Sequence, residues 1–129
     1  MKVLNIEQTL VDLAKRSLAG EEVGEILRSP NEFPVEIAEK IALLTAVKYW
    51  NKEISFLEGD CIINNLFVFW VTNDYFVKNY PFTDTLWECY LAFDAGEYYR
   101  SDDDRALDDP PEKYTKPLIK EMLQRIDEI

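Results

Sequence analysis

A dense run of carboxylates between Asp84 and Glu112 is the part of this sequence best suited to chemistry or binding. These 29 residues hold ten carboxylates against two cations, Arg100 and Arg105, which is a net charge of −8 out of −11 for the chain. Like charge at this density creates a negative potential that attracts basic partners and speeds their encounter. The ten are Asp84, Glu88, Asp94, Glu97, Asp102, Asp103, Asp104, Asp108, Asp109 and Glu112.

Catalysis by paired carboxylates and calcium binding are two chemistries that such residues could support. Glycoside hydrolysis needs one acid held neutral in an apolar pocket beside a cleft, and no spacing here shows such a pair. Calcium takes clustered oxygen ligands, and residues 101–111 offer five aspartates. An EF-hand, however, needs alternating ligands, a glycine at the sixth position and a glutamate at the twelfth. We therefore expect at most adventitious calcium binding and no designed metal site.

Other residue types that usually perform catalysis are missing from the chain. The sequence contains no histidine, which removes the commonest general base at neutral pH and the usual catalytic triads. Its four glycines are scattered singly, so none forms a phosphate-binding loop. We predict that the protein is not an enzyme and uses no cofactor.

Recognition of a basic protein is the function that the acidic run favours, because Tyr98 and Tyr99 lie within it. Tyrosine rings give rigid contact area and stack on arginine, and binding hot spots are enriched in them. The alternative is an acidic face that only solubilises the protein, with the tyrosines half-buried at its edge. The predicted partner-binding residues are Asp94, Glu97, Tyr98, Tyr99, Asp102, Asp103, Asp104, Asp108, Asp109 and Glu112.

Helical periodicity predicts the elements that lead to this surface. Apolar residues recur at helical spacing over residues 5–18, and a shorter helix is expected over 21–28. Pro34 suits the first turn of a third helix, which runs to Trp50. The apolar face of that helix is so wide that we expect it to be central.

The segment after Trp50 admits two interpretations. Ser55 and Glu58 form a capping-box pattern, and helical spacing continues to Tyr80, with a possible restart at Gly59 or Asp60. Residues Leu66–Val71 are instead rich in β-branched and aromatic types, which favours a strand. We prefer the helix, since no partner strand is evident to satisfy the backbone of a lone strand.

The acidic residues are expected on the next helix and on the loop that follows it. Thr83 is a predicted N-cap for a helix running toward Tyr99. Residues 101–111 contain aspartate runs and two prolines and are predicted to form an exposed loop, held near the body by Leu107. Thr115 and Pro117 begin the last helix.

The predicted fold is all-α, a single domain over residues 1–129 formed by an orthogonal bundle of five or six helices. An α+β fold is the alternative if Leu66–Val71 is a strand. Cys61 and Cys89 lack metal or redox spacing and are expected to be buried free thiols. The start of the chain shows no secretory signal, and the run from Cys61 to Thr72 is too short to cross a bilayer, so a cytoplasmic protein is predicted.

An acidic, histidine-free single domain with a patch of carboxylates and tyrosines resembles the immunity proteins of bacterial toxin systems, such as colicins and contact-dependent growth inhibition. The resemblance is one of type and covers size, charge and the segment DAGEYYRSDDDRALDDPPEKY. It implies tight binding to a cognate toxin, expected to be a nuclease, whose basic groove the acidic face would cover.

Two other functions stay open at this point. A nucleic-acid mimic would place carboxylates along an extended face, but residues 1–56 carry nine acids and seven bases, a net charge of only −2. The third possibility is a small accessory or metal-binding protein. Direct binding to nucleic acid or to an anionic membrane is disfavoured, because both would repel this chain.

Overall fold

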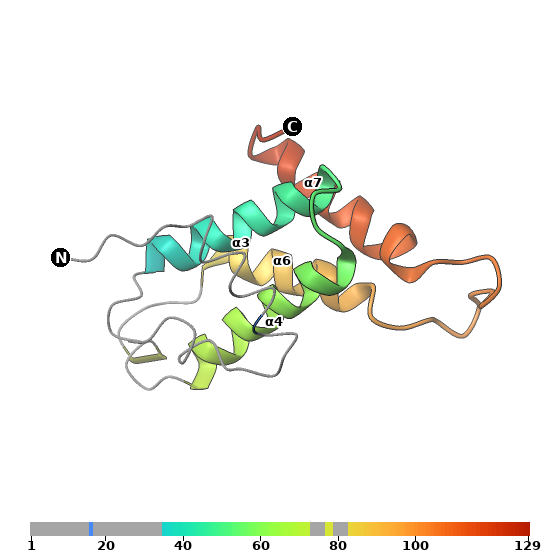
Figure 1. The fold of residues 1–129 in the computed structure, drawn as a ribbon, viewed down its shortest axis with the longest axis horizontal. Coiled ribbons are helices and arrows are strands. Elements are labelled where there is room, and N and C mark those ends of the chain that lie inside the picture. Colours follow the sequence, from blue (N-terminus) through green and yellow to red (C-terminus); the bar gives the residue numbers. More distant parts are fainter. Residues whose placement is uncertain (1–15, 17–34, 73–76, 79–82) are drawn as a thin grey trace.

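The computed structural model describes residues 16, 35–72, 77–78 and 83–129 (Figure 1). In this part of the chain four α-helices pack together and no strand is present, which confirms the all-α prediction. The count among these residues is four rather than the five or six expected. The helices predicted over residues 5–18 and 21–28 lie outside the described residues. The elements are α3 (Val35–Trp50), α4 (Phe56–Thr72), α6 (Asp84–Ala95), the π-helical turn η2 (Pro111–Thr115) and α7 (Lys116–Arg125).

A tight turn joins α3 to α4 and is capped on both sides. Lys52 has a φ of 63°, its N–H donates to the Tyr49 carbonyl at 3.1 Å, and the Glu53 N–H donates to the Lys48 carbonyl at 2.8 Å. This pair of bonds is a Schellman motif with a lysine where glycine is usual. Ser55 then exchanges hydrogen bonds with Glu58 at 3.0 and 3.1 Å, so the predicted capping box is confirmed.

Helix α4 runs from Phe56 to Thr72 without a break, so the restart predicted at Gly59 or Asp60 is wrong. Gly59 serves packing instead, because a Cβ there would lie 2.7 Å from the Phe93 ring. The strand alternative for Leu66–Val71 is also wrong, since these residues are helical. Residues 77–78 are helical as predicted, while 73–76 and 79–82 lie outside the described residues.

Helix α6 begins as predicted and ends earlier. The Thr83 hydroxyl oxygen accepts the Leu86 N–H at 3.4 Å, which confirms the N-cap. The helix ends at Ala95 with Gly96 as C-cap, so the expected extension toward Tyr99 is wrong. At Gly96 the backbone of η2 comes close: a Cβ would overlap the Thr115 hydroxyl and lie 3.0 Å from the Pro111 Cα.

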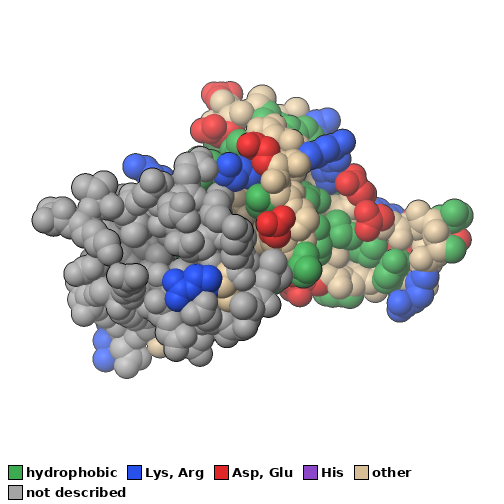
Figure 2. Space-filling view, in the orientation of Figure 1, with side chains coloured by type: hydrophobic (Ala, Val, Ile, Leu, Met, Phe, Trp, Pro, Cys, Tyr) green, Lys and Arg blue, Asp and Glu red, His purple; other side chains and the backbone are tan. Residues whose placement is uncertain are grey.

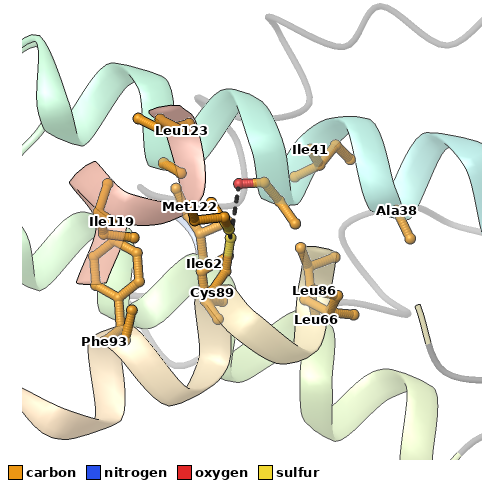
Figure 3. Close-up of a cluster of buried hydrophobic side chains, with 14 of the residues drawn as sticks. Ala38, Ile41, Ile62, Leu66, Leu86, Cys89, Phe93, Ile119, Met122 and Leu123 are labelled. Atoms are coloured by element: carbon orange, nitrogen blue, oxygen red, sulfur yellow. Dashed lines mark hydrogen bonds between the residues drawn. The ribbon is translucent and has the colours of Figure 1, made fainter. Parts of the chain in front are cut away.

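The core lies where α3, α4, α6 and α7 meet (Figure 3). Helix α3 contacts the other three helices, which confirms its predicted central position. The fully buried side chains of the core include Ile41, Ile62, Leu86, Phe93 and Ile119. The side chains of Ile119, Met122 and Leu123 project from α7 into this core (Figure 3) and anchor α7 to the other helices.

Both cysteines are free, as predicted. The Cys89 thiol is buried and lies 3.6 Å from the Ala42 carbonyl, to which it donates (Figure 3), and burial raises the pKa of Cys89 to about 12. Cys61 is only half-buried, so its expected full burial is wrong.

None of the helices in the described ranges is long and apolar enough to cross a membrane.

Candidate functional site

The acidic loop, residues 97–109, leaves the end of α6 and returns to the body at η2. In Figure 1 it is the orange segment that extends away from the helices. It contains no helix or strand, yet its own side chains hydrogen-bond to its backbone at several points. The loop therefore has a defined shape despite its excess of negative charge.

Asp103 is the centre of this shape. One of its carboxylate oxygens, Oδ1, accepts the Lys113 ammonium at 2.6 Å and the Tyr114 hydroxyl at 2.5 Å, and the other accepts the Arg100 N–H at 2.7 Å. The three donors leave the Asp103 side chain no exposed area. They hold the pKa of Asp103 well below its usual range, with the Lys113 hydrogen bond as the largest cause. The same bond raises the pKa of Lys113.

Asp104 and Asp108 close the tip of the acidic loop. Asp108 Oδ2 accepts the Asp104 N–H at 2.7 Å, and Asp104 Oδ1 accepts the Ala106 N–H at 2.8 Å. Lys113 also reaches Asp108, with 3.4 Å between the ammonium nitrogen and Oδ2. Three of the predicted partner-binding aspartates, Asp103, Asp104 and Asp108, thus use carboxylate oxygens to shape the loop.

The two arginines of the acidic run lie against tyrosine rings. The Arg100 guanidinium carbon is 4.7 Å from the centre of the Tyr98 ring and 3.9 Å from that of Tyr114. Its Nη1 donates to the carbonyls of Ala95 and Tyr98 at 2.6 and 2.8 Å. Arg105 stacks on Tyr99 at 4.8 Å. Tyr98 and Tyr99 therefore have intramolecular cation–π partners, although Tyr98 remains 55% exposed.

Leu107 does not hold the loop near the body, as the sequence had predicted. Its side chain is 83% exposed, more than that of any other large hydrophobic residue among those described. The Asp103 hydrogen bonds to Lys113 and Tyr114 perform that function instead. Figure 2 shows hydrophobic atoms at the outer end of the molecule beside acidic and basic side chains.

A second carboxylate cluster lies at the root of the loop, where Asp94 and Glu97 meet Asp60 of α4. Burial raises the pKa of Asp60 to about 7, with a further rise from the charge of Glu97. The pKa of Glu97 is also raised, first by burial and then by Asp94. Asn64 donates to Asp60 Oδ1 at 2.9 Å, which opposes the shift without cancelling it. A side-chain hydrogen bond between Asp60 and Glu97 also contributes to the raised pKa of Asp60.

Asp109 and Glu112 lie elsewhere, on a pocket bordered by Tyr49 of α3. Glu112 pairs with Lys116 at 3.2 Å. Asp102 is exposed on the loop. Glu88 pairs with Arg125 of α7, away from the loop. The structure thus divides the acidic run into a loop network, a root cluster and a pocket edge.

Among the described residues, no group of three or more acidic or cysteine side chains has the arrangement of a metal site. The oxygens most favourable for a cation in the loop already accept hydrogen bonds, at Asp103, Asp104 and Asp108. The geometry therefore does not favour calcium binding by the aspartate run.

Sequence reasoning missed four of the residues that complete these groups, namely Tyr49, Asp60, Asn64 and Lys113. Lys113 was within reach, because it directly follows the acidic run. Counting it gives ten carboxylates against three cations over residues 84–113, a net charge of −7. Asp60 gave no such signal, since it precedes Glu97 by 37 positions and meets it only in the folded chain.

Comparison of the chain with protein-family models, with curated proteins and with solved structures finds no match.

Proposed function

We propose that this protein binds a basic protein partner through the acidic loop and neutralises it, as immunity proteins do with their cognate toxins. The observation that carries the proposal is the Asp103 network. Like charges lie together on a protruding loop, and three hydrogen bonds to Asp103 fix the shape of that loop. Repulsion between those charges opposes folding, so a surface of this kind needs another reason to exist.

Preorganisation explains why such a loop would bind well. A loop already held in one conformation loses less entropy on association than a mobile one. Asp102 and Asp109 project exposed carboxylates from this frame, and neither makes a side-chain hydrogen bond or ion pair with another described residue. In this proposal they provide the steering charge, while Asp103, Asp104 and Asp108 maintain the frame.

A toxin nuclease is the class of partner that fits best. A nuclease must present lysines and arginines to phosphate groups, and it therefore offers a surface complementary to this loop. Neutralisation would be steric and electrostatic, with the loop covering the substrate groove. A nucleic-acid mimic is less well supported, because the charge is confined to one loop and its root. The cytoplasm is the proposed compartment.

The test begins with the reading frame directly upstream, which should encode a large secreted protein with a basic C-terminal domain. That domain is expected to co-purify with this protein and to lose its activity in the complex. Replacing Asp102 and Asp109 by asparagine should slow association about tenfold at low ionic strength and flatten its salt dependence. Stopped-flow fluorescence measures both quantities.

A matched control carries the same charge change away from the loop. Glu121 and Glu128 are exposed acids outside the acidic loop, on α7 and just beyond it. The double variant E121Q/E128Q should associate nearly as fast as the unmodified protein. Equal slowing in both double variants would mean that net charge, and not the acidic loop, governs binding.

A further inference from the structure

A pocket lies beside the acidic loop, between the turn that joins α3 to α4 and the start of η2. Its volume is about 530 Å³, within the range of small-ligand sites. Tyr49, Lys52 and Phe56 line it from the side of the turn, and Asp109, Glu112 and Lys116 from the side of η2. It therefore combines aromatic faces with carboxylates.

The aromatic wall is rigid. Tyr49 and Phe56 both pack on Phe93, at ring-centre distances of 5.2 and 5.8 Å, and Phe93 is fully buried in the core. The opposite wall is fixed by the Thr115 hydroxyl, which donates to the Ala92 carbonyl at 2.7 Å and ties η2 to α6. π-Helical turns such as η2 are rare, and those that occur are often at functional sites.

Among the described residues, two charges in the pocket remain unpaired, the carboxylate of Asp109 and the ammonium of Lys52. Glu53 pairs with Lys48 at 3.8 Å and Glu112 with Lys116 at 3.2 Å. Asp109 makes no side-chain ion pair or hydrogen bond with another described residue. Burial raises the pKa of Tyr49 to about 12, and the charges of Glu112 and Asp109 contribute. A negative potential therefore reaches the aromatic wall.

The chain itself shows how this surface holds a guanidinium group. Arg100 lies between the rings of Tyr98 and Tyr114 and donates to two backbone carbonyls. Asp103 accepts the backbone N–H of Arg100 and not its guanidinium. The pocket likewise offers two aromatic rings, Tyr49 and Phe56, and adds the carboxylate of Asp109.

An anion is a poorer occupant. The N-terminus of α4 borders this region, but its Ser55 and Glu58 N–H groups already donate to the capping box, and Glu58 adds negative charge there. Lys116 is neutralised by Glu112. Lys52 alone would favour an anion, and it opposes a cation.

We propose that this pocket receives an arginine side chain of the basic partner, with the guanidinium stacked on Tyr49 and Phe56 and facing Asp109. The identity of the partner rests on the proposed function, whereas the preference of the pocket for guanidinium does not. Stacking on aromatic rings is favoured for arginine over lysine, because its planar guanidinium is less strongly hydrated.

The test uses N-acetyl-arginine methylamide as the probe and amide NMR spectra of the full chain as the readout. Saturable shifts are expected at residues 52–56 and 109–116, with smaller ones for the lysine analogue and none for the neutral citrulline analogue. Asp109→Asn should weaken binding about fivefold, and Lys52→Gln should strengthen it about threefold. Asp102→Asn, with the same charge change outside the pocket, is the matched control and should leave the affinity unchanged.

Three results would overturn the inference: equal shifts from arginine and citrulline probes, shifts spread over residues 97–108, or the same shifts from inorganic phosphate. Its failure is distinct from failure of the proposed function. If the basic toxin domain binds but the arginine probe does not, only the pocket assignment falls. If the probe binds and no basic domain is neutralised, the pocket assignment stands and the immunity function falls.

Discussion

Two groups of carboxylates, one inside the acidic loop and one at its root, differ in opposite directions from ordinary aspartates. Asp103 has a lowered pKa and stays charged well below neutral pH. Asp60 has a pKa raised to about 7 and is partly protonated at neutral pH. Both groups belong to the same negative surface, so net charge alone does not explain the difference.

Hydrogen-bond donors and burial together account for the difference between the two pKa values. Asp103 accepts from an ammonium, a phenol and a backbone N–H, all of which favour the charged form. Asp60 has one side-chain donor, Asn64, and faces the carboxyl of Glu97 while losing solvent. Desolvation and a like charge both favour the neutral form. The loop therefore keeps its charge, whereas the root gives up part of it near neutral pH.

The largest effect is expected at Gly96, which directly precedes the acidic loop and packs against η2. Its φ of −92° suits any residue, so Gly96→Ala acts through sterics alone. The added Cβ would push η2 away from α6 and move Lys113 and Tyr114 off Asp103. We expect a loss of about 2–3 kcal/mol in urea denaturation, and a lower hydrogen-exchange protection factor at the Arg100 amide.

Gly59→Ala is the comparison for this variant. Its Cβ would also meet a buried neighbour, the Phe93 ring, but the site is in α4 and does not touch η2. It should lower global stability without a selective loss of protection at Arg100. If the two variants lowered the protection of the Arg100 amide equally, the contact of Gly96 with η2 would not be what supports the loop.

The next effect has the opposite sign. Because the pKa of Asp60 is raised in the folded state, its contribution is most favourable below pH 4 and is lost as the pH rises through 7. Asp60→Asn removes this loss and keeps an oxygen that can accept from Asn64. Allowing for solvent screening at a half-exposed site, it should stabilise the protein by about 1–2 kcal/mol at pH 8 and by almost nothing at pH 4.

Asp102→Asn separates this effect from general charge repulsion. Asp102 is exposed. At pH 8, above the pKa of Asp60, the two variants remove nearly the same charge. Urea denaturation at several pH values should show stabilisation that depends on pH only for Asp60→Asn. If both variants gave the same dependence of stability on pH, the stabilisation would come from lower charge repulsion over the whole surface and not from the root cluster.

Local signals made much of the fold predictable. The capping box at Ser55, the N-cap at Thr83 and the prolines that bound the helices act within a few residues, so a sequence pattern reports them directly. The C-terminal end of α6 was missed for the opposite reason. Tyr98 and Tyr99 continue the apolar spacing, but Gly96 must approach η2, and that contact is not local.

The candidate site was predictable only in outline. Charge located the acidic loop, but the function of Asp103 depends on contacts with Lys113 and Tyr114, ten and eleven residues away. Leu107 was expected to hold the loop near the body because it is apolar, whereas the hydrogen bonds that hold the loop are polar. Tyr49 and Asp109 are 60 positions apart, and only the folded chain brings them to one pocket.

The smallest change in global stability is expected for Asp103→Asn, since the network lies in a loop outside the core. Because the pKa of Asp103 is lowered, its contribution is complete above the unfolded value of about 3.9 and disappears as the pH falls through the lower, folded value. The unmodified protein should therefore keep protection at the Arg100 amide at pH 4. Asp103→Asn should lose much of it at every pH, with little shift in the urea midpoint, while Asp102→Asn should behave like the unmodified protein. Full protection in Asp103→Asn would mean that the tyrosine stacking of Arg100, and not the charge of Asp103, fixes the loop.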